Sequence, residues 1–202
     1  MLCAEDVPRG EGPWAPLEEA PGLLLHNCRG LNASLSRFGY RVYGEYCQAV
    51  YTRRETVPLP HKEIRLLTVE ELPYLIRCCE QAQDGGEPAE YVPRGDIREY
   101  LTDRLKSRAL YGVYVEERPV GFAGWNREGS IGCLYVEPAC RRRKLGASLT
   151  AFMVNQALEQ GRLPYAHIAV TNEAAKCLVE SMGFYRAGRT VFWMGKDVFS
   201  EK

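Results

Sequence analysis

Residues 134–149 read LYVEPACRRRKLGASL and join the end of an apolar strand to the start of a helix. The strand part carries leucine, tyrosine and valine, while Leu145 and Leu149 begin the apolar face of the helix. A run of basic residues fills the junction between them, namely Arg141, Arg142, Arg143 and Lys144. This succession of strand, basic turn and helix decides the fold and locates a candidate binding site.

The junction is suited to bind phosphate. A helix N-terminus presents unpaired N–H groups and about half a positive charge, so it binds anions without any particular side chain. Gly146 lets a phosphate approach the backbone closely because it has no Cβ. The diphosphate of coenzyme A suits such a site. A basic run taken alone is more typical of a solvated surface or a nucleic-acid patch, but its place between a strand and a helix favours phosphate binding.

Two blocks carry a resemblance to a known family. The stretch from Arg141 to Ala147 resembles the phosphate-binding turn of the GNAT N-acetyltransferase superfamily: Arg or Gln, two residues, Gly, one residue, then Gly or Ala. Arg141 and Gly146 match the ends of this pattern, whereas Lys144 stands where the first glycine usually lies. The block NEAAKCLVESMGF at residues 172–184 resembles the family's penultimate helix with its closing Gly-Phe. The resemblance covers residues 63–196.

The order of predicted elements agrees with this resemblance. Strands are predicted over 63–68, 110–116, 120–125, 131–136, 165–170, 184–188 and 190–194, and helices over 69–83, 95–107, 145–161 and 172–182. The resemblance implies an α/β (α+β) fold of the GNAT acyltransferase type, with a mixed, mostly antiparallel sheet flanked by helices. Residues 61–202 are expected to form this acetyltransferase domain, and residues 1–60 an N-terminal extension.

The resemblance also implies where the cofactor binds. The strands 131–136 and 165–170 are expected to splay apart, with pantetheine between them. Backbone groups of Leu134, Tyr135 and Val136 would then pair with the pantetheine amides and polarise the thioester carbonyl. The expected cofactor-binding residues are these three together with Arg141, Arg142, Arg143, Lys144, Leu145, Gly146, Ala147 and Asn172. Asn172 has an equally good interpretation as a helix N-cap only.

The catalytic groups are less well marked. Direct attack of a neutral amine on a thioester needs a proton acceptor and a donor for the leaving thiolate. Glu128 is the carboxylate nearest to where some relatives carry a base, so it is the candidate catalytic residue. Many relatives place a tyrosine as thiolate donor where this chain has Val179. Water remains an alternative donor, as do three nearby side chains, those of Cys177, Ser181 and Tyr185.

Composition excludes several classes. The chain has 202 residues, 46% of them hydrophobic, and Lys plus Arg equals Asp plus Glu at 26 each, so no global charge attracts nucleic acid or an anionic membrane. Eight cysteines show no C-x-x-C spacing, and together with three isolated histidines they predict packing residues rather than a metal site. No apolar run approaches the ~18 residues of a membrane span. Without a recognisable leader in residues 1–16, a cytoplasmic protein is expected.

The N-terminal 60 residues leave several possibilities open. Residues 1–16 are expected to be loose, residues 17–37 to form one or two short helices, and residues 40–52 to form a strand or a hairpin broken near Gly44. The stretch from Asn27 through Gly39 and Tyr40 echoes residues 172–184, which suggests a degenerate half-repeat. An extension that packs on the sheet edge or mediates a homodimer fits equally well, since an exposed strand invites association, and packing or a dimer contact is favoured over a second active site.

The expected function is transfer of acetyl from acetyl-CoA, without a metal, to a primary amine of a small molecule or peptide. The acceptor is expected over the loop 85–88 and the helix 96–107, where Glu87, Glu90 and Asp96 would attract a cation. The alternative is an acyl-CoA-binding or protein-interaction module with little catalysis, which the departures at Lys144 and Val179 favour.

Overall fold

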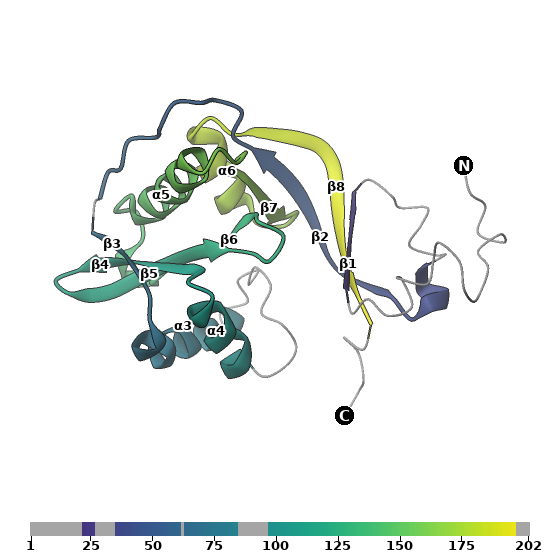
Figure 1. The fold of residues 1–202 in the computed structure, drawn as a ribbon, viewed down its shortest axis with the longest axis horizontal. Helices are drawn as coiled ribbons and strands as arrows, with labels where there is room; N and C mark the ends of the chain where they lie inside the picture. Colours follow the sequence, from purple (N-terminus) through teal and green to yellow (C-terminus); the bar gives the residue numbers. More distant parts are fainter. Residues whose placement is uncertain (1–21, 27–34, 62, 85–96, 197–202) are drawn as a thin grey trace. The chain divides into compact units, whose positions relative to one another are not determined.

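The computed structural model describes residues 22–26, 35–61, 63–84 and 97–196. These residues belong to two compact units (Figure 1). The larger unit comprises residues 48–187, and the smaller one combines residues 1–47 with residues 188–202. Both units contain part of the strands β2 (Arg41–Val50) and β8 (Tyr185–Gly195), because each strand begins in one unit and ends in the other.

The larger unit is built on a mostly antiparallel sheet. Its strands are β3 (Ile64–Leu66), β4 (Leu110–Val115), β5 (Arg118–Trp125), β6 (Ile131–Val136) and β7 (Tyr165–Ala169). They follow the order β7-β6-β5-β4-β3, and β2 is the other neighbour of β7. The pairs from β3 to β6 are antiparallel, while β6 and β7 are parallel. This arrangement confirms the predicted mixed α/β fold.

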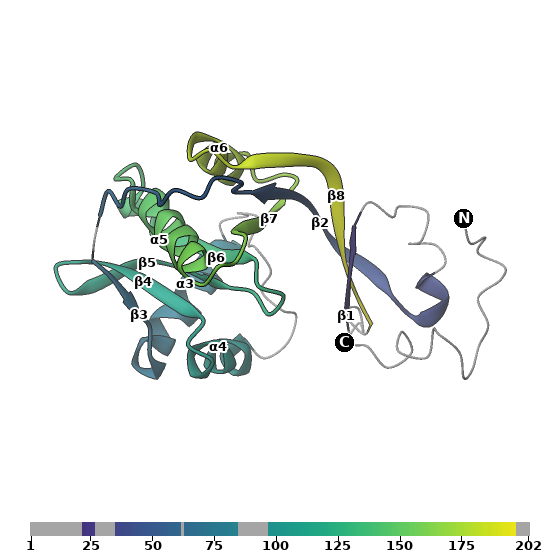
Figure 2. The ribbon, with the colours of Figure 1, turned by 45° about the horizontal axis from the view of Figure 1, so that its top comes forward.

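Helices cover both faces of this sheet (Figure 2). The helices α3 (Leu72–Asp84) and α4 (Ile97–Lys106) pack on one face, where their apolar side chains share a core cluster with Leu110, Tyr114 and Phe122. The helix α5 (Leu145–Glu159) lies on the opposite face, and α6 (Glu173–Ser181) follows β7. A capping box at Thr68 and Glu71 starts the short helix η2 (Val69–Glu71) that leads into α3.

The segment 51–61, between β2 and β3, is fastened to the outer face of α5. The side chain of Asn155 holds the backbone of Val57 through two hydrogen bonds, to its N–H at 2.7 Å and to its carbonyl at 2.9 Å. Ser148 Oγ accepts a third bond from the N–H of His61 at 2.9 Å. These contacts satisfy backbone groups that a segment crossing the surface would otherwise leave to water.

The smaller unit contains β1 (Gly22–His26), which pairs antiparallel with β8, and the short helix η1 (Ser36–Phe38) before β2. Its core cluster consists of Leu35, Tyr40, Phe192 and Met194. Among the described residues of the whole chain, no helix is long and apolar enough to cross a membrane.

The structure corrects two predictions in the terminal regions and decides a third. Residues 22–26 form a strand and not part of a helix, because a short apolar run fits either element and here it pairs with β8. Of the two alternatives for residues 40–52, the single strand is confirmed, since residues 41–50 form one strand without a break at Gly44. The two predicted closing strands are one continuous strand, β8, because Gly188 lies within extended backbone and does not end the strand. The predictions for residues 1–16 and for the loop 85–88 lie outside the described residues.

Candidate active site

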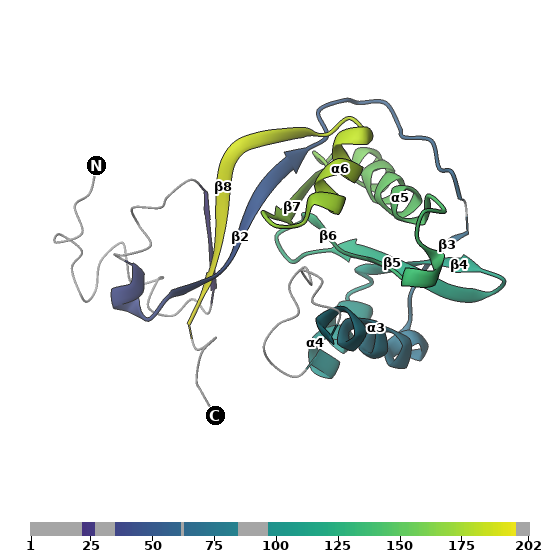
Figure 3. The same ribbon diagram turned by 180° about the vertical axis from the view of Figure 1, so that it is seen from behind.

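A gap between β6 and β7 forms the centre of the site (Figure 3). The two parallel strands pair at one position, Ile131 with Ala166, near their N-terminal ends. Beyond this pair the two strands diverge, and their register contains no further pair. The predicted splaying of these two strands is therefore present.

A β-bulge in β6 lies beside this gap. Gly124 of β5 pairs with Gly132, whereas Phe122 pairs with Tyr135, so β6 has one more residue than β5 between the two pairs. Cys133 in this interval adopts a left-handed φ of 55°, which is uncommon for a residue other than glycine. Bulges turn backbone groups and side chains away from the ladder. This bulge could not be predicted from the sequence, since cysteine is not a residue type that marks positive φ.

The basic turn ends in a left-handed residue at the start of α5. Lys144 is the N-cap of the helix with φ 61° and ψ 13°, and Arg142 has φ 63°. The N–H of Ser148 makes a helical hydrogen bond to the carbonyl of Lys144 at 3.0 Å. The N–H groups of Leu145, Gly146 and Ala147 come before this first helical hydrogen bond, so the helix itself contains no carbonyl acceptor for them. Left-handed turn residues and free N–H groups are the components of an anion-binding nest.

The side chains around this turn leave room for an anion. The basic run 141–144 is exposed to solvent. Arg141 also donates from Nε to the carbonyl of Val136 at 3.1 Å, which ties the turn to the end of β6. A Cβ added to Gly146 would lie 3.7 Å from Leu178 Cδ2 and 3.8 Å from Val136 Cγ2, both ordinary contact distances. Glycine at this position is therefore not required by the packing of the protein itself.

The left-handed backbone of Lys144 leads to a testable expectation about stability. A residue with a Cβ pays about 1 kcal/mol to adopt this conformation, and glycine does not. We expect Lys144→Gly to be more stable than Lys144→Ala by about this amount, because both variants lose the same charge. Urea denaturation of the two variants measures the difference; equal stabilities would show that the turn carries no such strain.

Glu128 lies in a polar cluster near the N-terminal end of the gap. Its carboxylate accepts a hydrogen bond from Ser130 Oγ, and its Oε1 lies 3.6 Å from His167 Nδ1 on β7. The Glu128 carbonyl accepts a 2.6 Å hydrogen bond from the hydroxyl of Tyr165. His167 is buried, whereas the Glu128 side chain is 31% exposed. The structure thus brings Glu128 together with a histidine that the sequence had given no role.

The environment of Glu128 fixes its charge. Partial burial by itself would raise the pKa of Glu128, but the nearby His167 and the hydrogen bond from Ser130 outweigh it and leave the pKa below the ordinary value of 4.5. The folded state therefore binds this proton less readily than the unfolded chain does. The resulting stabilisation is present above about pH 4.5 and is lost as pH falls through the lower pKa of the folded protein.

This pH dependence has its own test. We expect Glu128→Gln to be less stable than the parent at pH 7. On acidification below pH 4.5 the free energy of unfolding should fall less for Glu128→Gln than for the parent, because glutamine does not titrate. Denaturation midpoints measured from pH 3 to pH 7 check this. Parallel curves for the two proteins would mean that Glu128 does not have a lowered pKa in the folded state.

The remaining predicted positions lie on α6 and just after it. Asn172 is the N-cap of α6, and its Oδ1 accepts from the N–H of Ala175 at 3.0 Å. Val179 is buried, and its carbonyl accepts from the N–H of Phe184 after the left-handed Gly183. Three side chains nearby are exposed, those of Cys177, Ser181 and Tyr185. The usual tyrosine position thus holds an inward-facing apolar side chain.

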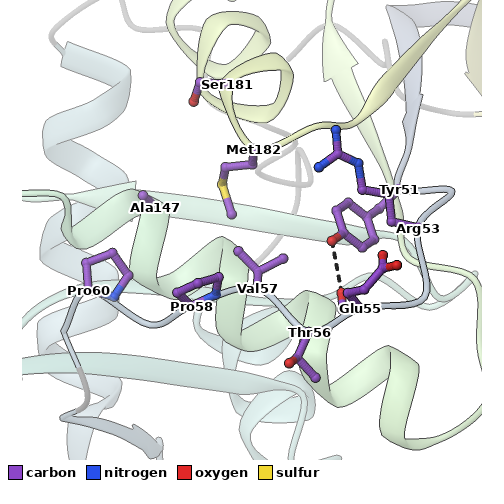
Figure 4. A pocket seen from close by; sticks show the side chains of 10 residues that line it. All are labelled: Tyr51, Arg53, Glu55, Thr56, Val57, Pro58, Pro60, Ala147, Ser181 and Met182. Carbon is purple, nitrogen blue, oxygen red and sulfur yellow. Dashed lines mark hydrogen bonds between the residues drawn. The ribbon is translucent and has the colours of Figure 1, made fainter.

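A cavity of about 760 Å³ adjoins the start of α5 (Figure 4). Ala147 lines it from α5, Ser181 and Met182 line it from the end of α6, and the segment 51–60 closes it from outside. Arg53 brings a cationic side chain to its wall, and Tyr51 donates to the Glu55 carbonyl at 2.9 Å. Because Ala147 lies in the first turn of α5, the cavity adjoins the part of the helix that follows the basic turn. Sequence reasoning missed it because its outer wall belongs to the predicted extension.

Metal ligands are not grouped in the described part of the chain. No cluster of three or more His, Cys, Asp or Glu residues there is arranged to hold a metal ion. Six cysteines in the described ranges are free thiols, of which Cys78 and Cys140 are buried. The burial of these two agrees with the prediction that cysteines serve as packing residues, whereas Cys177 is exposed.

Comparisons with known proteins point to one family. The profile of the "Acetyltransferase (GNAT) family" matches residues 69–184. No curated protein matches the chain by sequence. A GNAT-family protein from Novosphingobium aromaticivorans is 22% identical, with a TM-score of 0.58, and the match covers 79% of this chain and 68% of that one.

Two further solved structures share the fold. A Drosophila protein has a TM-score of 0.64 at 18% identity, covering 88% of this chain and 62% of that one. The ribosomal-protein-alanine N-acetyltransferase of Brucella melitensis has a TM-score of 0.53 at 20% identity, covering 66% of this chain and 98% of that one. At these identities the likeness concerns the fold alone.

Proposed function

Because the chain belongs to the GNAT acetyltransferase family, we propose that it transfers acetyl from acetyl-CoA to a primary amine of a small molecule or peptide. The family uses acetyl-CoA as the acetyl donor. The observation that carries the proposal is the position of the basic turn at the start of α5, beside the gap between β6 and β7.

The residues of the turn fit the diphosphate of coenzyme A. The N–H groups of Leu145, Gly146 and Ala147 would bind its oxygens, and Gly146 leaves the space they need. The four residues Arg141, Arg142, Arg143 and Lys144 would supply counter-charge in solvent. The adjoining cavity with Arg53 has room and a cation for the nucleotide end. Asn172 would contribute its amide N–H₂, because its Oδ1 already caps α6.

The exposed backbone of β6 would orient the pantetheine arm. β6 pairs with β7 only at Ile131 and Ala166, so the later backbone of β6, at Leu134, Tyr135 and Val136, would pair with pantetheine amides as an added strand does. The bulge at Cys133 redirects the backbone just before these residues. An N–H from this stretch, at Tyr135 or Val136, would polarise the thioester carbonyl.

Glu128 would take up the proton of the attacking amine. The amine nitrogen forms a bond to the acetyl carbon, the C–S bond breaks, and the leaving thiolate receives a proton. With a lowered pKa, Glu128 is a carboxylate at neutral pH and is ready to accept a proton, with His167 and Ser130 holding its orientation. Because Val179 is buried and apolar, we assign the thiolate proton to water.

Turnover with a panel of amines tests the proposal. The full chain is incubated with acetyl-CoA and, in turn, with polyamines, amino acids and peptides with alanine or lysine termini, while released thiol is followed. Peptides are included because one protein of similar fold acts on ribosomal-protein alanine. We expect steady thiol release and an acetylated amine, identified by mass, with one class of acceptor.

The alternative function is an acyl-CoA-binding module with little catalysis. This alternative is favoured by the buried Val179, which stands where many relatives carry a tyrosine as the proton donor for the thiolate. The binding module would use the same cofactor site as the transferase. Saturable binding of acetyl-CoA without thiol release across the panel would support the binding module and contradict the transferase.

A further inference from the structure

We infer that the chain contains two copies of one motif, which consists of a strand, a helix end and a second strand. The first copy is described over residues 22–26 and 35–50 and the second over residues 165–195, and the copies have exchanged their last strands. The inference concerns how the acetyltransferase unit is completed and does not depend on its activity. Four features of the two copies support it: the helix end, the buried side chains, the strand that follows and the strand pairing.

The helix ends have the same backbone geometry. In the first copy, Gly39 has φ 83° and its N–H donates to the Ser36 carbonyl at 3.1 Å, while the N–H of Tyr40 donates to the Leu35 carbonyl at 3.3 Å. This pair of bonds around a left-handed glycine is the Schellman helix end.

The second copy repeats this geometry. Gly183 has φ 86° and its N–H donates to the Glu180 carbonyl at 3.0 Å, while the N–H of Phe184 donates to the Val179 carbonyl at 3.0 Å. Both helix ends have the same order of residue types: an apolar residue, two polar residues, a second apolar residue, glycine and an aromatic residue. This order runs from Leu35 to Tyr40 in the first copy and from Val179 to Phe184 in the second. The two helix ends are therefore equivalent residue by residue.

The side chains at equivalent positions play the same part. Leu35 and Val179 are both buried, at 6% and 4% exposure, and so are the aromatic residues after the glycine, Tyr40 at 1% and Phe184 at 6%. Each helix end thus anchors its strand by burying one aliphatic and one aromatic side chain in its own unit.

The strands after the helix ends also correspond. β2 begins at Arg41, directly after Tyr40, and β8 begins at Tyr185, directly after Phe184. A second glycine follows at the same spacing in each, Gly44 and Gly188. Each of these long strands begins in the unit of its own helix end and finishes in the other unit.

The strand pairing shows the exchange. β8 of the second copy pairs antiparallel with β1 of the first, with Gly195 opposite Gly22. Correspondingly, β2 of the first copy lies next to β7 of the second, and the N–H of Tyr51 donates to the Pro164 carbonyl at 2.9 Å. These four strands follow the order β1-β8-β2-β7. Replacing each strand by its counterpart in the other copy, β1 by β7 and β2 by β8, gives the same order read from the opposite edge. Without exchange, β8 would lie beside β7, and β2 beside β1.

The exchange gives the N-terminal segment a role in the acetyltransferase unit. The strand beside β7 comes from residues before 51, so this segment covers an edge that would otherwise present unpaired backbone groups. Because β7 forms one side of the active-site gap, β2 supports the strand that carries His167. The N-terminal segment is then part of the catalytic fold and not an appended module.

Paired cysteine substitutions in the full chain test the exchange. With β2 and β7 antiparallel, as β1 and β8 are, the hydrogen bond from the N–H of Tyr51 to the Pro164 carbonyl sets these two residues opposite each other and places Ala49 opposite Ala166. Opposite residues of antiparallel strands have Cα atoms about 4.5–5.5 Å apart, within reach of a disulfide. The test protein carries Ala49→Cys with Ala166→Cys, the control carries Met194→Cys with Ala166→Cys, and Leu23→Cys with Met194→Cys is the positive reference.

The exchange predicts an intrachain disulfide in the test protein and in the reference, and none in the control. Non-reducing electrophoresis and mass mapping of linked peptides identify the bonds among the native thiols. A disulfide in the control without one in the test protein would overturn the exchange, as would a test protein whose disulfide joins two chains. Neither readout uses acetyl-CoA or turnover, so failure here leaves the proposed function standing.

Discussion

Gly146→Asp should weaken coenzyme A binding at least 100-fold, which corresponds to about 2.7 kcal/mol. The aspartate side chain would occupy the space left for phosphate and place a negative charge beside it. Two like charges about 4 Å apart repel by about 4 kcal/mol near a protein surface, enough for this loss. Calorimetric titration with coenzyme A measures the effect.

The same substitution should leave the fold intact. Its Cβ meets Leu178 and Val136 at ordinary contact distances, and an acidic residue in a first helical turn is favourable. We therefore expect the urea midpoint of Gly146→Asp to be at least that of the parent. Gly188→Asp is the matched control, because a Cβ there meets nothing within 4 Å and the site is not on α5. Unchanged affinity in a folded Gly146→Asp protein would refute the phosphate turn.

Glu128→Gln should lower kcat/KM about 100-fold with the best amine acceptor. General base catalysis contributes roughly 10²–10⁴-fold, and a carboxylate with a lowered pKa is a weak base, which places the loss at the low end of that range. The affinity for coenzyme A should not change, because Glu128 lies near the N-terminal end of β6 and the basic turn follows its C-terminal end.

Two further variants distinguish the loss of a proton acceptor at Glu128 from the loss of one negative charge anywhere on the protein. Glu128→Asp keeps a carboxylate and should retain more activity than the glutamine variant. Glu159→Gln removes an exposed carboxylate at the end of α5 and should behave as the parent. If Glu128→Gln retains activity within threefold of the parent, the proton is accepted elsewhere.

The sequence predicted what local patterns encode. The turn at Arg141 to Gly146 was recognisable because a helix start, a basic run and a glycine occur together, and the structure places them at the N-terminus of α5. The departure at Lys144 proved compatible with the turn, since lysine adopts the left-handed conformation that glycine adopts more readily. The elements from β3 to α6 were predicted in their correct order for the same reason.

The sequence did not predict what depends on distant pairing. The strand at residues 22–26 is defined by its contact with β8, and its short apolar run carries no period that separates strand from helix. The bulge at Cys133 depends on the register with β5, and the approach of His167 to Glu128 depends on the pairing of β6 with β7. None of these features has a residue type or spacing that marks it along the chain.

The central claim is that coenzyme A binds across the start of α5 and the open edge of β6. An NMR titration of the ¹⁵N-labelled chain with coenzyme A tests it most directly. The account predicts saturable shifts of the amide signals of Leu145, Gly146 and Ala147 together with those of Leu134 to Val136. No shifts, or saturable shifts confined to other parts of the chain, would contradict it.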